Sequence, residues 1–182
     1  MEGEALHIHG ELIQRCRQGD REAHYKIYKL YSRSMFNVGY RIVNNTEEAE
    51  DVLQESFVSA FKNLDHYRGD STFGAWLKRI VVNRAINYIK KKRLERLPED
   101  EHWDVKEEEI IDEFENFPFT VEQVRSAIEN LPDGYRTVLS LYLLEGYDHG
   151  EIAGILGITE STSKSQFNRS KKKLKELLTG GE

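Results

Sequence analysis

The sequence predicts an all-α protein, in which two small helical domains are joined by a flexible acidic linker. Only three prolines occur in 182 residues, and stretches in which β-branched residues alternate with polar ones are scarce. Apolar residues instead recur at three- and four-residue spacing, and residues that cap helices precede several of these segments. Glycines and prolines then separate the segments, so we expect a chain of short, individually capped helices.

Composition restricts the compartment and the chemistry. Charged residues make up 32% of the chain and the mean hydropathy is −0.65, and no apolar run approaches the roughly 20 residues of a membrane span. The N-terminus lacks the basic start and apolar core of a secretory signal. The single cysteine, Cys16, has no partner for a disulfide or a cysteine zinc site. We therefore expect a cytoplasmic protein that holds no metal or other cofactor and does not insert into membranes.

The first domain, residues 1–93, begins with three predicted helices. A short helix covers Glu11 to Arg17, and Asp20 caps a longer helix that continues to Ile42. Asn45 caps a third helix over Thr46–Leu64, with Glu48 as its capping-box partner. The long helix supplies a large set of expected core residues: Tyr25, Tyr28, Leu30, Tyr31, Met35, Phe36, Val38 and Ile42.

The third helix carries a mainly acidic outer face. Asp51, Gln54, Glu55 and Val58 follow one another at three- and four-residue spacing, which places most of them on one side of the helix. Such a face is either simply solvated or a docking surface for a basic partner.

The fourth helix is predicted to bind nucleic acid. Residues 66–70 form a loop, Ser71 or Thr72 caps the helix, and the helix continues to about Arg93. From residue 78 to 93 there are seven basic residues and no acidic one, and Asn83 and Asn87 share a face. With Tyr67 in the loop, this combination is typical of a single-strand binding platform. Trp76 falls in the apolar stripe and is expected in the core.

Residues 94–120 form the predicted linker. They include eleven acidic and two basic residues, which gives this segment a net charge of −9. Because the whole chain has a net charge of −6, the residues outside the linker carry a net charge of +3. Such a composition predicts an extended, mobile segment. Carboxylates could in principle serve a metal-dependent nuclease, but acidic residues on a flexible segment have no fixed geometry, which disfavours that interpretation.

The second domain, residues 121–182, ends in a predicted helix-turn-helix. Asp148 and Glu151 form a capping box, Gly157 makes the turn, and Thr159 caps the last helix. Between residues 161 and 175 that helix has six basic residues and no acidic one. A basic second helix of this kind enters the DNA major groove, whereas the alternative is an ordinary helical hairpin. Before this motif we expect helices over Val121–Asn130 and Gly134–Glu145, the latter with core residues Val138, Leu139, Leu141, Tyr142 and Leu143.

Several motifs in both domains resemble the extracytoplasmic-function group of bacterial RNA polymerase sigma factors. They are AEDVLQESF at 49–57, YRGDSTFGAWLKRIVVNRAINYI at 67–89, LP at 131–132 and EIAGILGIT at 151–159. The order of these motifs, with a linker between them, makes the resemblance specific over nearly the whole chain. One departure is Ser163, which stands where the family tends to have an apolar anchor; packing of the last helix should then depend more on Phe167.

The resemblance implies a non-catalytic subunit that binds core RNA polymerase, through its β′ clamp and β subunits, and directs it to promoter DNA. It also implies a separate anti-sigma factor as regulator, and a linker that threads the polymerase's RNA-exit path. The residues that match the β′-docking helix are Asp51, Gln54, Glu55 and Val58. Those that match the part recognising and opening the −10 element, with Asn83 at the pocket for a flipped base, are Tyr67, Arg68, Gly69, Lys78, Arg79, Asn83 and Asn87. The −35 duplex would meet Lys164, Ser165, Asn168 and Arg169, with Lys171 and Lys172 at phosphates.

A second function remains open from the residues alone. A free-standing helix-turn-helix regulator would bind duplex DNA without polymerase, as a dimer on a palindromic site. That hypothesis leaves the basic and acidic faces of residues 46–93 unexplained.

Overall fold

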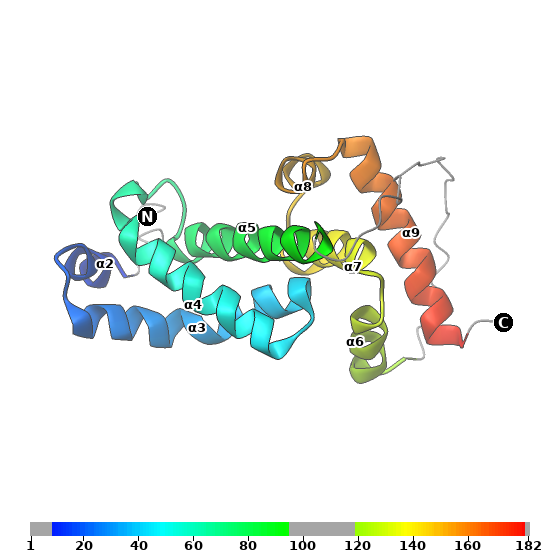
Figure 1. The fold of residues 1–182 in the computed structure, drawn as a ribbon, viewed down its shortest axis with the longest axis horizontal. Helices are drawn as coiled ribbons and strands as arrows, with labels where there is room; N and C mark the ends of the chain where they lie inside the picture. The colour runs from blue at the N-terminus through cyan, green and yellow to red at the C-terminus, as the bar shows by residue number, and fades with distance from the viewer. Residues whose placement is uncertain (1–8, 95–118, 181–182) are drawn as a thin grey trace, which may run out of the picture. The chain divides into compact units, whose positions relative to one another are not determined.

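The computed structural model describes residues 9–94 and 119–180, and within these ranges the chain forms helices and turns but no strand (Figure 1). The prediction of an all-α fold is confirmed. The chain divides into two compact units, Met1–Glu95 and Arg96–Glu182. Nearly all of the predicted acidic linker lies outside the described residues. None of the described helices is both long and apolar enough to cross a membrane.

The first unit is a three-helix bundle with one additional short helix. Among its described residues the helices are α2 (Gly10–Arg17), α3 (Arg21–Val43), α4 (Thr46–Lys62) and α5 (Phe73–Leu94). Helices α3, α4 and α5 each pack against the other two, α2 packs on α3, and a short 3₁₀ turn follows α4 (Figure 1). The side chains that meet in the centre are fully buried, which stabilises the fold by roughly 1.5–3 kcal/mol for each large aliphatic residue. They include Ile27, Ile42, Val52, Leu77 and Val81.

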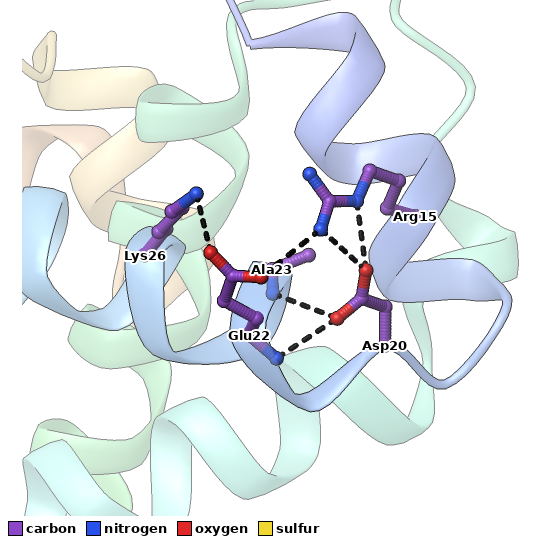
Figure 2. A network of polar contacts seen from close by, with 5 residues as sticks. All are labelled: Arg15, Asp20, Glu22, Ala23 and Lys26. Carbon is purple, nitrogen blue, oxygen red and sulfur yellow. Dashed lines mark hydrogen bonds and ion pairs between the residues drawn. The ribbon is translucent and has the colours of Figure 1, made fainter.

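Local capping determines where these helices begin. The Asp20 carboxylate accepts hydrogen bonds from the backbone N–H groups of Glu22 and Ala23, at 2.9 and 3.2 Å (Figure 2). Asn45 caps α4 through the Glu48 N–H, at 3.0 Å, so both predicted caps are confirmed. The predicted return bond of a capping box is not made, because the Glu48 carboxylate instead forms an ion pair with Lys92 of α5. Glu48 therefore ties α4 to α5.

Two expected core residues of α3 lie on the surface. Tyr25 is 60% exposed and Leu30 is 53% exposed. The bundle packs on only one side of α3, so an apolar residue on the opposite side stays in solvent whatever its hydrophobicity. The sequence pattern of α3 is apolar almost all round, and periodicity therefore did not separate the two sides.

The second unit consists of shorter helices around a long C-terminal one. Its elements are α6 (Val121–Glu129), α7 (Asp133–Leu139), the π-helical turn η2 (Ser140–Leu144), α8 (His149–Leu156) and α9 (Glu160–Thr179). Helix α9 packs against α6, α7 and α8 (Figure 1). The predicted helix-turn-helix is confirmed in its details: Asp148 and Glu151 form a capping box, Gly157 has φ 73°, and Thr159 caps α9.

The predicted helix over Gly134–Glu145 is present, but its second half is π-helical instead of α-helical. After α7 the backbone widens into a π-helical turn, closed by the Glu145 N–H donating to the Ser140 carbonyl at 3.0 Å. Such a turn holds one more residue than an α-helical turn, so side chains within it are displaced from their α-helical positions. Tyr142 and Leu143 lie in this turn; both were expected in the core, and they are 37% and 55% exposed.

Candidate nucleic-acid interfaces

The outer face of α4 presents the four residues predicted to dock on a partner. Asp51, Gln54, Glu55 and Val58 are all exposed, and Val58 leaves 52% of its surface to solvent. The face therefore carries two carboxylates and, at its C-terminal end, an exposed aliphatic side chain, a composition suited to a basic partner with an apolar contact point.

A shallow groove extends this face from α4 toward α5. The Arg84 guanidinium of α5 forms an ion pair with the Glu55 carboxylate, with 3.0 Å between Nη1 and Oε2. Arg84 is separated from Glu55 by 29 residues, so the α4 motif alone did not reveal it. The residues that line the groove are Gln54, Glu55, Val58, Ser59, Lys62, Asn63 and Arg84.

Tyr67 does not offer the exposed ring that was predicted for it. The side chain is only 5% exposed, its hydroxyl donates to the Ser71 carbonyl at 2.8 Å, and its ring lies 5.5 Å from that of Phe73. Arg17 of α2 also donates to the Tyr67 carbonyl, at 2.6 Å. Burial raises the pKa of Tyr67. Tyr67 thus anchors the loop between α4 and α5 to the core, where it cannot stack on a base.

The neighbouring loop residues remain available, and a different aromatic lies beside them. Arg68 is exposed, and Gly69 adopts φ 83°, a conformation that L side chains rarely take. Trp76, which was expected in the core, is only half-buried, and its ring lies 5.4 Å from that of Tyr67. The apolar stripe of α5 places Trp76 at the edge of the core, which periodicity alone cannot distinguish from its centre.

Helix α5 displays the predicted polar face. Arg79, Asn83 and Asn87 are exposed, whereas Lys78 is half-buried. Trp76 precedes Asn83 by seven residues, or two helical turns, so it lies on the same side of α5. The described residues of α5 hence bring an aromatic edge, two amides and a guanidinium to one face.

Helix α9 presents a second basic face. Lys164 and Lys172 are exposed, and Ser165, Asn168, Arg169 and Lys171 are half-buried. Lys164 forms an ion pair with Glu160 at 2.7 Å, which raises the pKa of the lysine. The Lys171 ammonium lies 5.3 Å from the centre of the Phe167 ring. These residues recur at three- and four-residue spacing, so one side of α9 is cationic along most of its length.

The opposite side of α9 packs through polar residues, which was not expected. Ser163, Gln166 and Ser170 are buried, and the Ser163 hydroxyl lies 2.9 Å from Nδ1 of His149 at the start of α8. The His149 ring is stacked on Tyr142, with 4.5 Å between ring centres, and Phe167 lies against both rings. Burial lowers the pKa of His149, and nearby Lys164 lowers it further.

A hydrogen bond and an aromatic stack thus hold α8 against α9 where an apolar anchor was missing. The expected role of Phe167 in packing is confirmed by its two ring contacts. Near the C-terminal end of α9, Leu177 is 38% exposed. In the part of the chain that the structure describes, no three histidine, cysteine or acidic side chains gather at a possible metal site.

The chain matches two family descriptions, one in each unit. Sigma-70 region 2 matches residues 27–95, and Sigma-70, region 4 matches residues 121–174. The first match contains the exposed faces of α4 and α5, and the second contains the helix-turn-helix.

Curated relatives and solved structures agree with these matches. The ECF RNA polymerase sigma-E factor of Haemophilus influenzae is 32% identical over 177 residues, covering 92% of this chain and 93% of that protein. The ECF RNA polymerase sigma factor SigW of Bacillus subtilis is 28% identical over 176 residues, covering 91% and 94%.

Two solved structures share the fold at 22% identity. CnrH, in complex with the cytosolic domain of CnrY, has a TM-score of 0.55 and covers 94% of this chain and 97% of its own. The sigma factor RpoE of Bartonella quintana, in complex with the anti-sigma factor NepR, has a TM-score of 0.57 and covers 85% and 96%. The two family matches and the sigma-E relative at 32% identity show that the chain belongs to the sigma-70 family, as an extracytoplasmic-function sigma factor that directs RNA polymerase.

Proposed function

We propose that this sigma factor divides its work among three helix faces. The exposed face of α4 docks on core polymerase, the face of α5 recognises and opens the −10 element, and the face of α9 reads the −35 duplex. The observation that carries the proposal is the distribution of charge: α4 presents Asp51 and Glu55, whereas the outer faces of α5 and α9 are cationic. Residues 1–93 would thus hold the docking and opening functions, and residues 121–182 the −35 function.

The exposed residues of α4 provide the proposed contact with core polymerase. Asp51, Gln54 and Glu55 precede Val58 on this face, and a partner that covers Val58 removes an exposed apolar side chain from water. The β′ clamp of polymerase is the expected partner. The Arg84–Glu55 ion pair is solvent-exposed and contributes at most about 1 kcal/mol, so a partner can replace it at little cost.

The opening step requires that a base leave the stack, at a cost of a few kcal/mol. The exposed amides of Asn83 and Asn87 can hydrogen-bond the edge of an extruded base, and Arg68 and Arg79 can contact phosphates. Because the Tyr67 ring is buried, the proposal assigns no stacking contact to it. We propose instead that the half-exposed edge of Trp76, on the same side of α5 as Asn83, takes the contact with an unstacked base.

Replacing Asn83 with alanine is expected to weaken promoter opening and leave −35 binding unchanged. Loss of one base-directed amide should cost about 1–3 kcal/mol at the melted strand. Permanganate reactivity of thymines around −10 measures opening, and a mobility shift on an isolated −35 duplex measures the other step. Gln14→Ala removes an exposed amide from α2 as the matched control. Equal losses in both assays would remove Asn83 from the base pocket.

The duplex-reading step is assigned to α9. Arginine can donate two hydrogen bonds to guanine, and asparagine can pair with adenine, in the major groove. Asn168 and Arg169 supply these groups and are half-buried, so their positions are restricted by packing. The more exposed Lys172, with Lys164 and Lys171, is suited to phosphate contacts, which give affinity and salt dependence without base preference.

Arg169→Ala is expected to change which DNA sequence is preferred, whereas Lys172→Ala is expected to weaken binding to every sequence. Loss of Arg169 should cost about 1–3 kcal/mol on the preferred −35 duplex and relax preference at one base pair. Loss of Lys172 should weaken all sequences alike and lower the salt slope of binding by about 0.9. Binding to a panel of single-base −35 variants at several salt concentrations separates the two. A uniform loss for Arg169→Ala would make it a phosphate contact instead.

The proposal also covers the partners and the compartment. We propose that the protein acts in the cytoplasm as a non-catalytic subunit, and that a separate anti-sigma factor controls it. The complexes of CnrH with CnrY and of RpoE with NepR motivate that proposal, although at 22% identity they establish the fold alone.

Transcription with purified core polymerase tests the proposed function. Genomic promoter templates should give promoter-dependent transcripts only when this chain is added. The free-standing regulator predicts the reverse, a footprint on a palindromic site without polymerase. Absence of any dependent transcript, together with such a footprint, would favour the regulator.

A further inference from the structure

A stripe of basic and aromatic side chains runs along the outer side of α3. It consists of Tyr25, Lys29, Arg33, Phe36 and Tyr40, and these five residues are called the α3 stripe below. Successive members are three or four residues apart, so they fall on one side of the helix. The buried residues of α3 occupy the other side, where the helix packs on α4 and α5. The stripe is therefore separate from the faces of α4 and α5 described above.

Beyond its first turn, α3 itself carries charge of one sign. No acidic residue occurs between Glu22 and Glu47, a segment that contains four basic residues. At the N-terminal end of α3, the acids are already paired: Glu22 lies 2.7 Å from Lys26 and 3.6 Å from Arg15, and Asp20 lies 2.6 Å from Arg15 (Figure 2). These partners hold the pKa values of both carboxyl groups below their usual range. Because these two acids are paired with Arg15 and Lys26, the exposed cations Lys29 and Arg33 remain in the middle of α3.

The aromatic members of the stripe are left out of the core. Tyr25 is 60% exposed, with the Lys29 ammonium 5.8 Å from its ring centre. Phe36 and Tyr40 are half-buried and stacked on each other, with ring centres 6.1 Å apart and planes at 19°. By contrast, Tyr28 on the inner side packs against Phe57, at 4.9 Å. Surface aromatics beside unpaired cations are the combination on which unstacked bases bind.

We infer that the α3 stripe is an additional nucleic-acid contact, which takes a single strand by stacking bases on Tyr25 and the Phe36–Tyr40 pair while Lys29 and Arg33 contact phosphates. From Tyr25 to Tyr40 the helix rises about 22 Å, which is enough for several nucleotides of an extended strand. A single strand is favoured over a duplex because only unpaired bases expose their faces. An acidic protein surface is the alternative occupant, and the cross-linking experiment below distinguishes it from a single strand.

Binding of the full chain to fluorescent single-stranded oligonucleotides tests this inference. DNA and RNA strands of one mixed sequence should both bind, and the tighter of the two identifies the natural strand. Lys29→Gln and Arg33→Gln should each lower the slope of log affinity against log salt by about 0.7. Arg125→Gln removes an exposed arginine from α6 in the other unit and should leave the slope unchanged. Equal slopes for the wild type and both stripe variants would overturn the inference.

Two further variants examine the aromatic contact. Tyr25→Ala should weaken strand binding about fivefold or more, whereas Tyr25→Phe should retain it, because stacking needs only the ring. A photoreactive phenylalanine at Tyr25 should cross-link the strand, and the same group at Val121, which is 79% exposed in the other unit, should not. If, in the complex with polymerase and promoter, the group at Tyr25 cross-links only a polymerase subunit, the stripe is a protein contact and the inference fails.

The binding experiments on the α3 stripe can fail without contradicting the DNA contacts proposed for α5. Arg79→Gln removes a proposed phosphate contact of α5 and should also lower the salt slope by about 0.7. If Arg79→Gln has that effect while the stripe variants have none, the proposed function stands and the α3 inference fails.

Discussion

Replacing Tyr67 with alanine is expected to destabilise the first unit by about 3–5 kcal/mol, the range for truncating a buried aromatic ring. The ring is almost fully buried and contacts Phe73 and Trp76. Its removal would leave a cavity under the loop and would also release the Ser71 carbonyl from its hydrogen bond. Because the loop leads directly into α5, a shift there would reach the face that carries Asn83.

Urea unfolding followed by tryptophan fluorescence measures this effect. Trp103→Phe is made in every variant, so that Trp76, 5.4 Å from the Tyr67 ring, is the sole reporter. Tyr67→Phe keeps the ring and loses only the hydroxyl, so it should cost about 1 kcal/mol and leave promoter opening intact. An alanine variant as stable as the parent chain would show that Tyr67 does not anchor the loop.

Replacing Arg136 with alanine should destabilise the second unit by about 2–4 kcal/mol. Arg136 is only 3% exposed, and its guanidinium donates to the Leu131 carbonyl at 2.8 Å and to Asp133 at 2.5 Å. It therefore fastens the turn between α6 and α7 from the inside. Loss of the side chain would leave a cavity and an unpaired carbonyl. Asp133 is exposed, so water would solvate its free carboxylate and limit the cost.

Differential scanning calorimetry of the full chain can follow the second unit. Arg136→Lys retains the charge but lacks the planar fork that reaches both partners, so an intermediate loss is expected. Arg125→Ala removes an exposed arginine of α6 that pairs with Glu129 across one helical turn, at 3.4 Å. That control should change stability by no more than about 0.5 kcal/mol. Equal effects of Arg125→Ala and Arg136→Ala would contradict the assigned role of burial.

The sequence predicts best those features that depend on neighbouring residues. The caps by Asp20, Asn45, Asp148 and Thr159 and the turn at Gly157 all follow from local hydrogen bonding or from a positive φ, and all are present. The outer face of α4 follows equally from local spacing, because it needs only the helical period.

Features that depend on distant packing could not be predicted. Whether Tyr67 or Trp76 is the more buried aromatic depends on how the loop closes on α2 and α5, and single-sequence periodicity gives no information on that. The groove at Arg84 and the pair between His149 and Ser163 also join residues that are far apart in sequence.

Docking of the α4 face on core RNA polymerase can be measured as the affinity of the labelled chain for that enzyme in a fluorescence titration. Wild-type protein should bind, and Val58→Asp should bind at least about tenfold more weakly, a difference of about 1.4 kcal/mol. That change places a carboxylate at the exposed apolar contact point of the α4 face. An absence of binding by the wild-type chain, combined with its protection of a symmetric DNA site without polymerase, would contradict the account.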